Sequence, residues 1–201
     1  MPRTSDARRR IVTAAARLFV ERSYHAVGVD ELCVTADVRK GSFYHQFSSK
    51  SELAKAVVDL HARAFAERLG RDPDASAAEK LHAVPDAIGA IQGGFESQFG
   101  RVVGCPFGNL AAELSTTDEN VRAHLAGRLA EMERGLAETC REAADQGVLR
   151  EGTDPDQLAH ALFAQYQGLI LLAKLNGSGA AGLAPALHEL IDGYLADPVG
   201  A

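Results

Sequence analysis

The 201-residue chain contains no tryptophan and only three cysteines, Cys33, Cys105 and Cys140, which lie far apart in the sequence. An odd number of widely spaced cysteines argues against a disulfide framework or a zinc site, and it predicts a cytoplasmic protein. No run of about 18 apolar residues is present, so we expect no membrane-spanning helix. The N-terminal MPRTSDARRR has no apolar stretch behind its charges and does not read as a signal peptide.

Sequence motifs of the common enzyme classes are also missing. The seven histidines show no metal-ligand spacing, and no phosphate-binding loop, dinucleotide-binding glycine motif or nucleophile elbow occurs. The sequence therefore predicts no metal, no cofactor and no catalytic residue.

The apolar residues make up 46% of the chain and are mainly alanine and leucine, which favours helices over sheet. They recur at helical spacing, as in the stripe formed by Ile11, Ala14, Ala15, Leu18 and Phe19. We therefore predict an all-α fold.

The net charge of −6 is divided unevenly along the chain. Residues 1–60 carry ten Lys and Arg against seven Asp and Glu, a net charge of +3, whereas residues 61–201 carry 11 against 20, a net charge of −9. The division fits a DNA-binding head on an acidic body that phosphate would repel. A charge of +3 over 60 residues is also ordinary for a protein surface.

Residues 29–47, VDELCVTADVRKGSFYHQF, contain two short helical patterns separated at Asp37. The second pattern directs Phe43 and Phe47 inward. This arrangement predicts a helix-turn-helix, whose second helix can enter the major groove of DNA. Its exposed residues supply cations, hydroxyls and an imidazole for phosphates and base edges, and its glycine lets the backbone approach a phosphate; they are Arg39, Lys40, Gly41, Ser42, Tyr44 and His45.

A further helix is predicted to begin at about Ser49, because Ser49 and Glu52 have capping-box spacing. Lys50 lies at its N-terminus, where a cation and backbone amides together suit a phosphate. We expect this linking helix to end near Leu69, before the helix-breaking residues 70–74.

The segment from Ser23 to Leu53 resembles the DNA-binding head of the TetR-like (TetR/AcrR) family of bacterial transcriptional regulators. The residues that match are Tyr24, Val29, Asp30, Glu31, Leu32, Ala36, Val38, Lys40, Gly41, Ser42, Phe43, Tyr44, Phe47, Ser49, Lys50 and Leu53. The resemblance implies a homodimer of about nine helices per subunit. It also implies a three-helix DNA-binding domain at residues 1–48 and a ligand-binding and dimerisation domain at residues 49–201.

By the same resemblance, the DNA contacts fall on Arg39, Lys40, Gly41, Ser42, Tyr44, His45 and Lys50. The implied function is a repressor that a small-molecule effector releases from a near-palindromic double-stranded DNA operator. A helical protein-interaction module without DNA binding is the alternative of another class, but it would have no use for the surface from Arg39 to His45.

Three positions depart from the family pattern. Gly28 stands in place of the usual hydroxyl cap, and Arg39 in place of the usual serine. Asp37 stands where the family has the turn glycine, and aspartate tolerates a left-handed backbone better than most residues. We therefore expect the turn to form and operator preference to differ from that of serine-bearing members.

The rest of the chain is predicted to be helical. We expect one helix over residues 76–90 with Pro85 as a kink, and a second apolar segment over residues 91–99. Further helices are expected from Pro106, from Thr117 or Asp118 to Gly147, from Pro155 to Gly177, and over residues 183–195. The last two, at about 154–175 and 183–195, are apolar enough to form a four-helix bundle between two subunits, although both could instead be internal core helices.

A small-molecule site would need aromatic walls and a few polar groups. The candidate residues of this type are Phe95, Phe99, Cys105, Phe107, Asn109, Phe163, Tyr166 and Gln167. Ordinary core packing is the alternative for each of them.

Cys105 precedes Pro106 at a predicted helix N-terminus, where amide dipoles increase the reactivity of a thiol. Lys174 lies near the end of a helix that could pack against it. An alternative function is therefore a thiol-based repressor that senses oxidants or electrophiles through Cys105 with Lys174 as a cationic neighbour. The plainer alternative is a small buried apolar cysteine.

Overall fold

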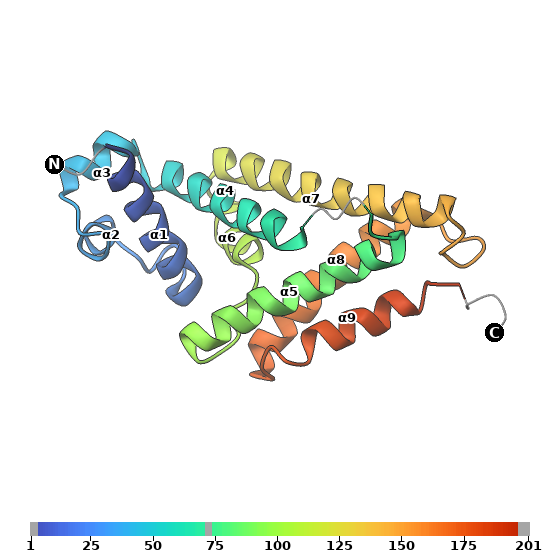
Figure 1. The fold of residues 1–201 in the computed structure, drawn as a ribbon. Helices are drawn as coiled ribbons and strands as arrows, with labels where there is room; N and C mark the ends of the chain where they lie inside the picture. The colour runs from blue at the N-terminus through green and yellow to red at the C-terminus, as the bar shows by residue number, and fades with distance from the viewer. Residues whose placement is uncertain (1–3, 71–73, 197–201) are drawn as a thin grey trace. The chain divides into compact units, whose positions relative to one another are not determined.

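The structure, a computed structural model, describes residues 4–70 and 74–196 (Figure 1). Within these residues the chain forms nine helices and no strand. The helices are α1 Thr4–Arg22, α2 Val29–Thr35, α3 Lys40–Gln46, α4 Lys50–Leu69, α5 Ala77–Phe99, α6 Pro106–Leu114, α7 Glu119–Asp145, α8 Pro155–Asn176 and α9 Leu183–Asp192. An isolated antiparallel bridge joins Leu149 to Leu195. None of the described helices is both long and apolar enough to cross a membrane. The all-α prediction is confirmed.

The chain divides into two compact units. The first contains residues 1–64 and 105–129, and the second contains residues 65–104 and 130–201, as far as these are described. The boundaries fall inside α4 and α7, so each of these helices has residues in both units. The division at residue 48 that the sequence suggested stays a prediction.

In the first unit, α1 packs against both α2 and α3 (Figure 1). The α1 stripe is buried as expected, and Phe43 of α3 and Leu32 of α2 are completely buried against it. Asp37, between α2 and α3, has a φ of 50°, which is the left-handed conformation expected at this turn. Because Phe43 is held inward, the neighbouring side chains of α3 face away from this core.

The helix starts of the first unit follow their predicted caps. The Ser49 hydroxyl accepts a hydrogen bond from the Glu52 amide at 3.1 Å, just before α4. The Asp118 carboxylate accepts one from the Val121 amide at 3.0 Å and so caps α7. Asp59 of α4 then accepts hydrogen bonds from His124 at 2.9 Å and Arg128 at 2.8 Å, which tie α4 to α7.

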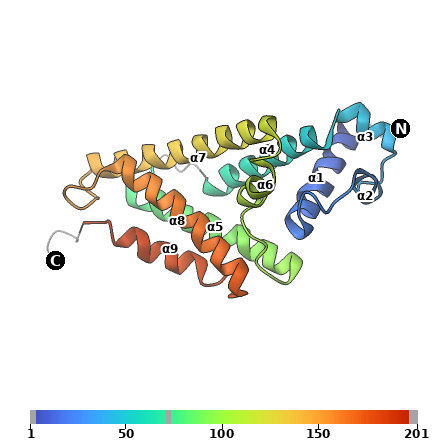
Figure 2. The same ribbon diagram turned by 180° about the vertical axis from the view of Figure 1, so that it is seen from behind.

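In the second unit, α9 lies along α5 and also contacts α8 (Figure 1 and Figure 2). Leu187 and Ile191 of α9 are buried, as are Leu81 and Ile88 of α5. A Cβ atom added to Gly89 would lie 2.9 Å from the Cβ of Ala184, so the two helices can approach this closely only because residue 89 is glycine.

The prediction of two separate segments over residues 76–90 and 91–99 is wrong, because α5 is one continuous helix. Ser76 caps its start, and Gly100, with a φ of 71°, ends it. Pro85 is buried inside the helix and does not end it. Neither Ala90 nor Ile91 is of a residue type that commonly caps a helix, so the helix does not end there.

The buried face of α8 includes only some of its apolar residues. Its buried residues are Leu158, Ala159, Leu162, Tyr166, Ile170 and Ala173. Leu171, Leu172 and Leu175 are exposed. The C-terminal part of α8 therefore carries apolar side chains that its own subunit leaves uncovered.

Candidate nucleic-acid interface

The predicted DNA-contacting residues of α3 lie together on its exposed side. Gly41, Ser42, Tyr44 and His45 are exposed, and Tyr44 retains 51% of its accessible surface. The Tyr44 ring stands edge-on to the buried Phe43 ring, with centroids 5.2 Å apart. This contact orients the phenol ring, and the residue stays about half exposed.

Arg39 is the residue before the first turn of α3, and its side chain makes no capping hydrogen bond. Gly28 occupies the same position before α2, again without a side-chain cap. Neither α2 nor α3 therefore begins with a side-chain cap. The Arg39 side chain is exposed and available to a phosphate.

Lys40 is held by α2 in the DNA-free protein. Its ammonium lies 2.7 Å from the Asp30 carboxylate, and this hydrogen bond raises the pKa of Lys40. Both side chains are exposed. A phosphate or base that binds Lys40 must therefore displace the Asp30 carboxylate or share the Lys40 ammonium with it.

Lys50 lies at the start of α4 but points toward α1. Its ammonium donates a hydrogen bond to the Tyr24 carbonyl at 2.5 Å and lies 4.0 Å from the centre of the Tyr24 ring. Burial lowers the pKa of Lys50. Lys50 thus joins α4 to the end of α1, and its contact with phosphate stays a prediction.

Glu113 of α6 holds the same turn from another direction. Its carboxylate accepts hydrogen bonds from the backbone amides of Tyr24 and His25, each at 2.9 Å, and lies 3.0 Å from Nδ1 of His25. Burial acts to raise the pKa of Glu113, but these hydrogen bonds hold it below its ordinary value. Sequence reasoning missed this residue, because nothing near Glu113 in the chain indicates a partner about ninety positions away.

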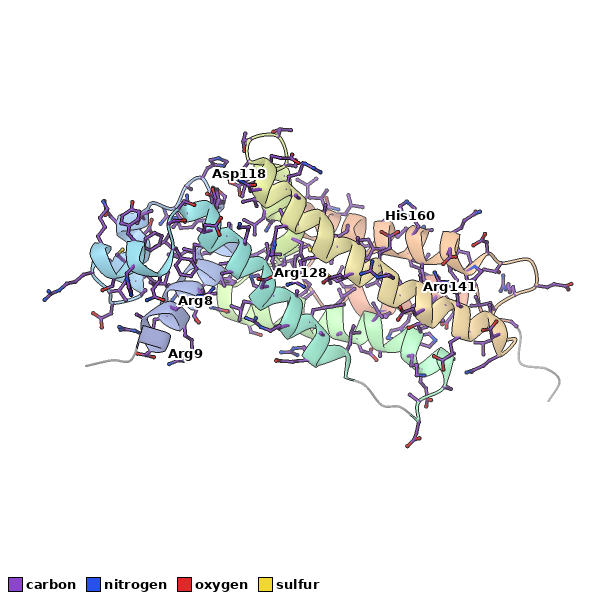
Figure 3. The ribbon with its side chains drawn as sticks, turned by 90° about the horizontal axis from the view of Figure 1, so that it is seen from above. Arg8, Arg9, Asp118, Arg128, Arg141 and His160 are labelled. Carbon is purple, nitrogen blue, oxygen red and sulfur yellow. The ribbon has the colours of Figure 1, made fainter. Side chains whose placement is uncertain are left out.

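Arg8 and Arg9 lie near the start of α1 (Figure 3). The Arg8 guanidinium lies 5.0 Å from the centre of the Phe47 ring, and Arg9 pairs with Asp6 at 2.8 Å. Arg10 pairs with Asp37 in the turn between α2 and α3 at 3.0 Å. Arg8 and Arg10 thus contact residues on either side of α3, whereas Arg9 pairs within α1.

Three of the predicted effector residues belong to α6 or directly precede it. Cys105 is the residue before the first turn and is partly exposed. Asn109 is also partly exposed, whereas Phe107 is buried with its ring 6.4 Å from that of His61. Burial lowers the pKa of His61 to about 4, so this imidazole is neutral at physiological pH.

The other predicted effector residues belong to the second unit. Phe95 and Phe99 of α5 are partly exposed, with ring centroids 6.2 Å apart. On α8, Phe163 and Gln167 are partly exposed and Tyr166 is buried. Whether these residues and those of α6 line one site stays a prediction.

Sequence reasoning also missed Gln92, which is the only buried polar or charged residue in the described part of the chain. Its amide donates to the Gly104 carbonyl at 3.3 Å. A signal was present in the sequence, since Leu81, Ile88 and Gln92 follow helical spacing on the buried side of α5. A polar side chain on an otherwise apolar stripe is a candidate for ligand recognition.

The three cysteines differ in their surroundings. Cys33 and Cys140 are buried, and burial raises the pKa of both, to about 11 for Cys140. Cys105 is partly exposed and belongs to neither core. Lys174, its predicted neighbour, is exposed on the last turns of α8.

Comparison of the sequence with known families gives matches over most of the chain. Residues 11–57 match the family described as bacterial regulatory proteins, tetR family. Residues 77–184 match the tetracyclin repressor-like C-terminal domain. The transcriptional regulator AcuR of Cereibacter sphaeroides is 35% identical over 176 residues, which span 87% of this chain and 80% of the relative.

The transcriptional repressor NemR of Escherichia coli is 28% identical over 176 residues, which span 86% of each chain. The crystal structure of its reduced form gives a TM-score of 0.82 at 25% identity and covers 97% of this chain and all of the other. The crystal structure of a regulatory protein TetR from Rhodobacter sphaeroides gives a TM-score of 0.81 at 29% identity over 94% of this chain and 99% of the other.

Replacing Asp30 with asparagine tests whether the pair with Lys40 limits DNA binding. In Asp30→Asn, Lys40 is no longer held by an opposite charge, so we expect severalfold tighter binding at low salt. The plot of log affinity against log salt concentration should become steeper by up to about one. Fluorescence polarisation of labelled operator DNA measures both quantities.

Glu31→Gln is the matched control, because Glu31 lies beside Asp30 in α2 but pairs with Arg22. It removes the same charge and leaves Lys40 paired. Equal gains in the two variants would mean that total charge, and not release of Lys40, controls the affinity.

Proposed function

Because the chain belongs to the TetR family of bacterial regulatory proteins, we propose that it is a repressor whose α3 helices read a near-palindromic operator and whose C-terminal helices bind an uncharged effector. It is a ligand-responsive, DNA-binding transcriptional regulator. The finer assignments of DNA contacts, dimer helices and effector chemistry are the proposal. A cytoplasmic location stays a prediction.

The exposed side of α3 carries the proposal. It presents two cations, two hydroxyls and an imidazole, from Arg39, Lys40, Ser42, Tyr44 and His45, around a glycine that allows close backbone approach. Hydroxyls and cations of this kind bind phosphates, and a bidentate contact of a cation with guanine specifies sequence. The buried Phe43 fixes which side of the helix faces the groove.

We propose that two subunits associate through α8 and α9. Leu171, Leu172 and Leu175 of α8 retain 61%, 51% and 77% of their accessible surface. Three large exposed apolar side chains within two helical turns are typical of an interaction surface. A two-fold dimer would place the two α3 helices in successive major grooves, about 34–36 Å apart.

The buried polar atoms of the second unit indicate the chemistry of the effector. Oε1 of Gln92 and the hydroxyl of Tyr166 are both buried without a hydrogen-bond partner. An unsatisfied buried group costs about 1–3 kcal/mol, so a ligand that satisfies it binds more tightly. Burial raises the pKa of Tyr166, which keeps its hydroxyl protonated as a donor. With no buried charge among the described residues, the proposed effector is uncharged and offers an acceptor to Tyr166 and a donor to Gln92.

The proposed route from effector to DNA runs along α6. This helix carries the predicted effector residues Phe107 and Asn109 near its start and Glu113 near its end. Glu113 holds the backbone of Tyr24 and His25, which lead into α2. A shift of α6 would therefore move the turn that positions the helix-turn-helix.

A thiol-based repressor is the second candidate. Cys105 is the partly exposed cysteine, at the N-terminus of α6, whereas burial makes Cys33 and Cys140 poor thiolates. NemR, a repressor with a solved reduced form, is among the similar proteins. The proposed role of Lys174 is that of a cation near the oxidised or alkylated thiol.

Binding to the protein's own upstream DNA tests the repressor proposal. Tyr44→Ala should weaken binding by about 1–3 kcal/mol, because it removes a direct contact to the operator. Tyr44→Phe should lose part of the same binding free energy if the hydroxyl makes the contact. Sedimentation should show an unchanged dimer for both variants. Wild-type affinity in Tyr44→Ala would contradict the proposed docking of α3.

The effector chemistry can be tested by thermal unfolding. Tyr166→Phe removes an unsatisfied hydroxyl, so the free protein should become more stable by up to about 1–3 kcal/mol. Small amides and esters should raise the Tm of the wild type more than the matching carboxylates do, and Tyr166→Phe should reduce the increase. A Tm increase produced equally by carboxylates, or unchanged in Tyr166→Phe, would contradict an uncharged effector bound at Tyr166.

The thiol alternative predicts a different outcome in the same DNA-binding assay. Diamide or a reactive aldehyde should release the wild type and the control Cys140→Ser from DNA, whereas Cys105→Ser should stay bound. Release that persists in Cys105→Ser, or no release of the wild type, would rule out sensing through Cys105 and leave the non-covalent effector.

A further inference from the structure

Four titratable side chains form a line between α5 and α9, and none of them was singled out in the sequence. The Asp86 carboxylate lies 2.8 Å from Nε2 of His188. Nδ1 of His188 lies 2.7 Å from Nδ1 of His82, and Nε2 of His82 lies 3.2 Å from the Asp192 carboxylate. Two residues of the line come from each helix.

The order of atoms in this line fixes the number of protons it needs. Each Nε2 must carry a hydrogen, because its partner is a carboxylate that can only accept. The contact between the two Nδ1 atoms needs one hydrogen, on either ring. Three hydrogens on four ring nitrogens mean that one histidine is neutral and the other is an imidazolium.

Any other number of protons breaks one of the contacts. With two hydrogens, either the two Nδ1 lone pairs face each other at 2.7 Å or one aspartate loses its donor. With four, two N–H groups face each other and two positive rings are adjacent. The line is complete only in the singly protonated state, whose net charge is −1.

The ring geometry favours a shared hydrogen over a metal ion. The ring centroids are 4.9 Å apart, close to the nitrogen separation plus the two ring radii, so the Nδ1 atoms face each other nearly head-on. Two nitrogens bound to one metal would instead point toward a common third position. In the described part of the chain, no group of three His, Cys, Asp or Glu residues is placed to hold a metal ion.

The protonation of the two histidines also depends on their exposure and on the charged groups nearby. His82 and His188 retain 27% and 31% of their side-chain surface, so both are shielded but can exchange protons with solvent. Four charged groups of α5, α7 and α8 have partners of their own: Lys80 with Glu142 at 2.7 Å, Arg141 with Asp156 at 2.6 Å, His160 with Glu133 at 2.7 Å, and Glu79 with Ser76. Glu189 of α9 is exposed next to His188.

We propose that His82 and His188 form a proton-dependent latch that holds α9 on α5 when the pair carries a single positive charge. Around the latch, Leu187 and Ile191 are buried and Gly89 lets α9 approach closely, so opening the latch disturbs a tightly packed contact. The latch uses residues of α5 and α9 alone and would exist whatever effector the protein binds.

The latch predicts a bell-shaped dependence of stability on pH. Above about pH 6.5, the ordinary midpoint for histidine, the two unfolded histidines bind fewer than three protons, so raising the pH favours unfolding. Below it they bind more than three, so lowering the pH favours unfolding as well. An ordinary His–carboxylate pair loses stability in one direction only, as the pH rises.

Urea unfolding of the full chain at fixed protein concentration, from about pH 5 to pH 8, tests this prediction. His188→Gln keeps an N–H that can reach Asp86 but has no second ring nitrogen. The unfolding constants of the wild type and His188→Gln should differ most near about pH 6.5. That difference should shrink by up to about tenfold per pH unit on either side.

His160→Gln is the matched control, because it removes one His–carboxylate pair from the same unit. The difference between its unfolding constant and that of the wild type should change in one direction only as the pH rises. A flat or one-directional difference for His188→Gln would overturn the latch. So would stabilisation by zinc or nickel that depends on His188, or destabilisation by EDTA, because either would make the pair a metal site.

Nitrogen-15 NMR of histidine-labelled wild type gives a test that needs no variant. Near pH 6.5 we expect both Nε2 atoms to be protonated and a scalar coupling between the two Nδ1 nuclei through the shared hydrogen. Two independent neutral rings without this coupling would also overturn the proposal.

Discussion

Ionised side chains of two helices, α4 and α6, hold the turn at Tyr24 by hydrogen bonds. The position of the DNA-reading helix depends on this turn. Glu113 accepts the Tyr24 and His25 amides, while Lys50 donates to the Tyr24 carbonyl. A turn with both its donors and its acceptor satisfied by ionised side chains is strongly defined, because charge-assisted hydrogen bonds are about twice as strong as neutral ones. The orientation of α2, and through it α3, therefore depends on α4 and α6.

This arrangement separates positioning from recognition. Lys50 and Glu113 face inward and set the turn, whereas Ser42, Tyr44 and His45 face solvent and are free to contact DNA. Lys40 is intermediate, since its ammonium is exposed but paired with Asp30. A negatively charged neighbour lowers non-specific attraction to phosphate, so it can raise the ratio of specific to non-specific binding.

Local patterns in the sequence predicted local structure well. Asp37 adopts the left-handed turn, Ser49, Asp118 and Asp154 cap the helices expected, and Phe43 is buried. Each of these depends on residues within a few positions, which is the range that periodicity and capping describe. The same rules gave the wrong end for the helix at Ala90, because a weak apolar pattern there resembled a break although no capping residue was present.

The long-range polar contacts could not be predicted in the same way. Glu113 is 88 and 89 positions from the amides it binds, and His82 is 106 positions from His188. Neither pair leaves a periodic trace, because each needs only one residue on each helix. These contacts also differ from the apolar core in what they do: burial of Leu187 and Ile191 holds α9 in place at any pH, whereas a contact that needs a fixed number of protons holds only in part of the pH range. Polar groups placed between packed helices thus make the stability of a fold depend on pH, whereas apolar packing alone would not.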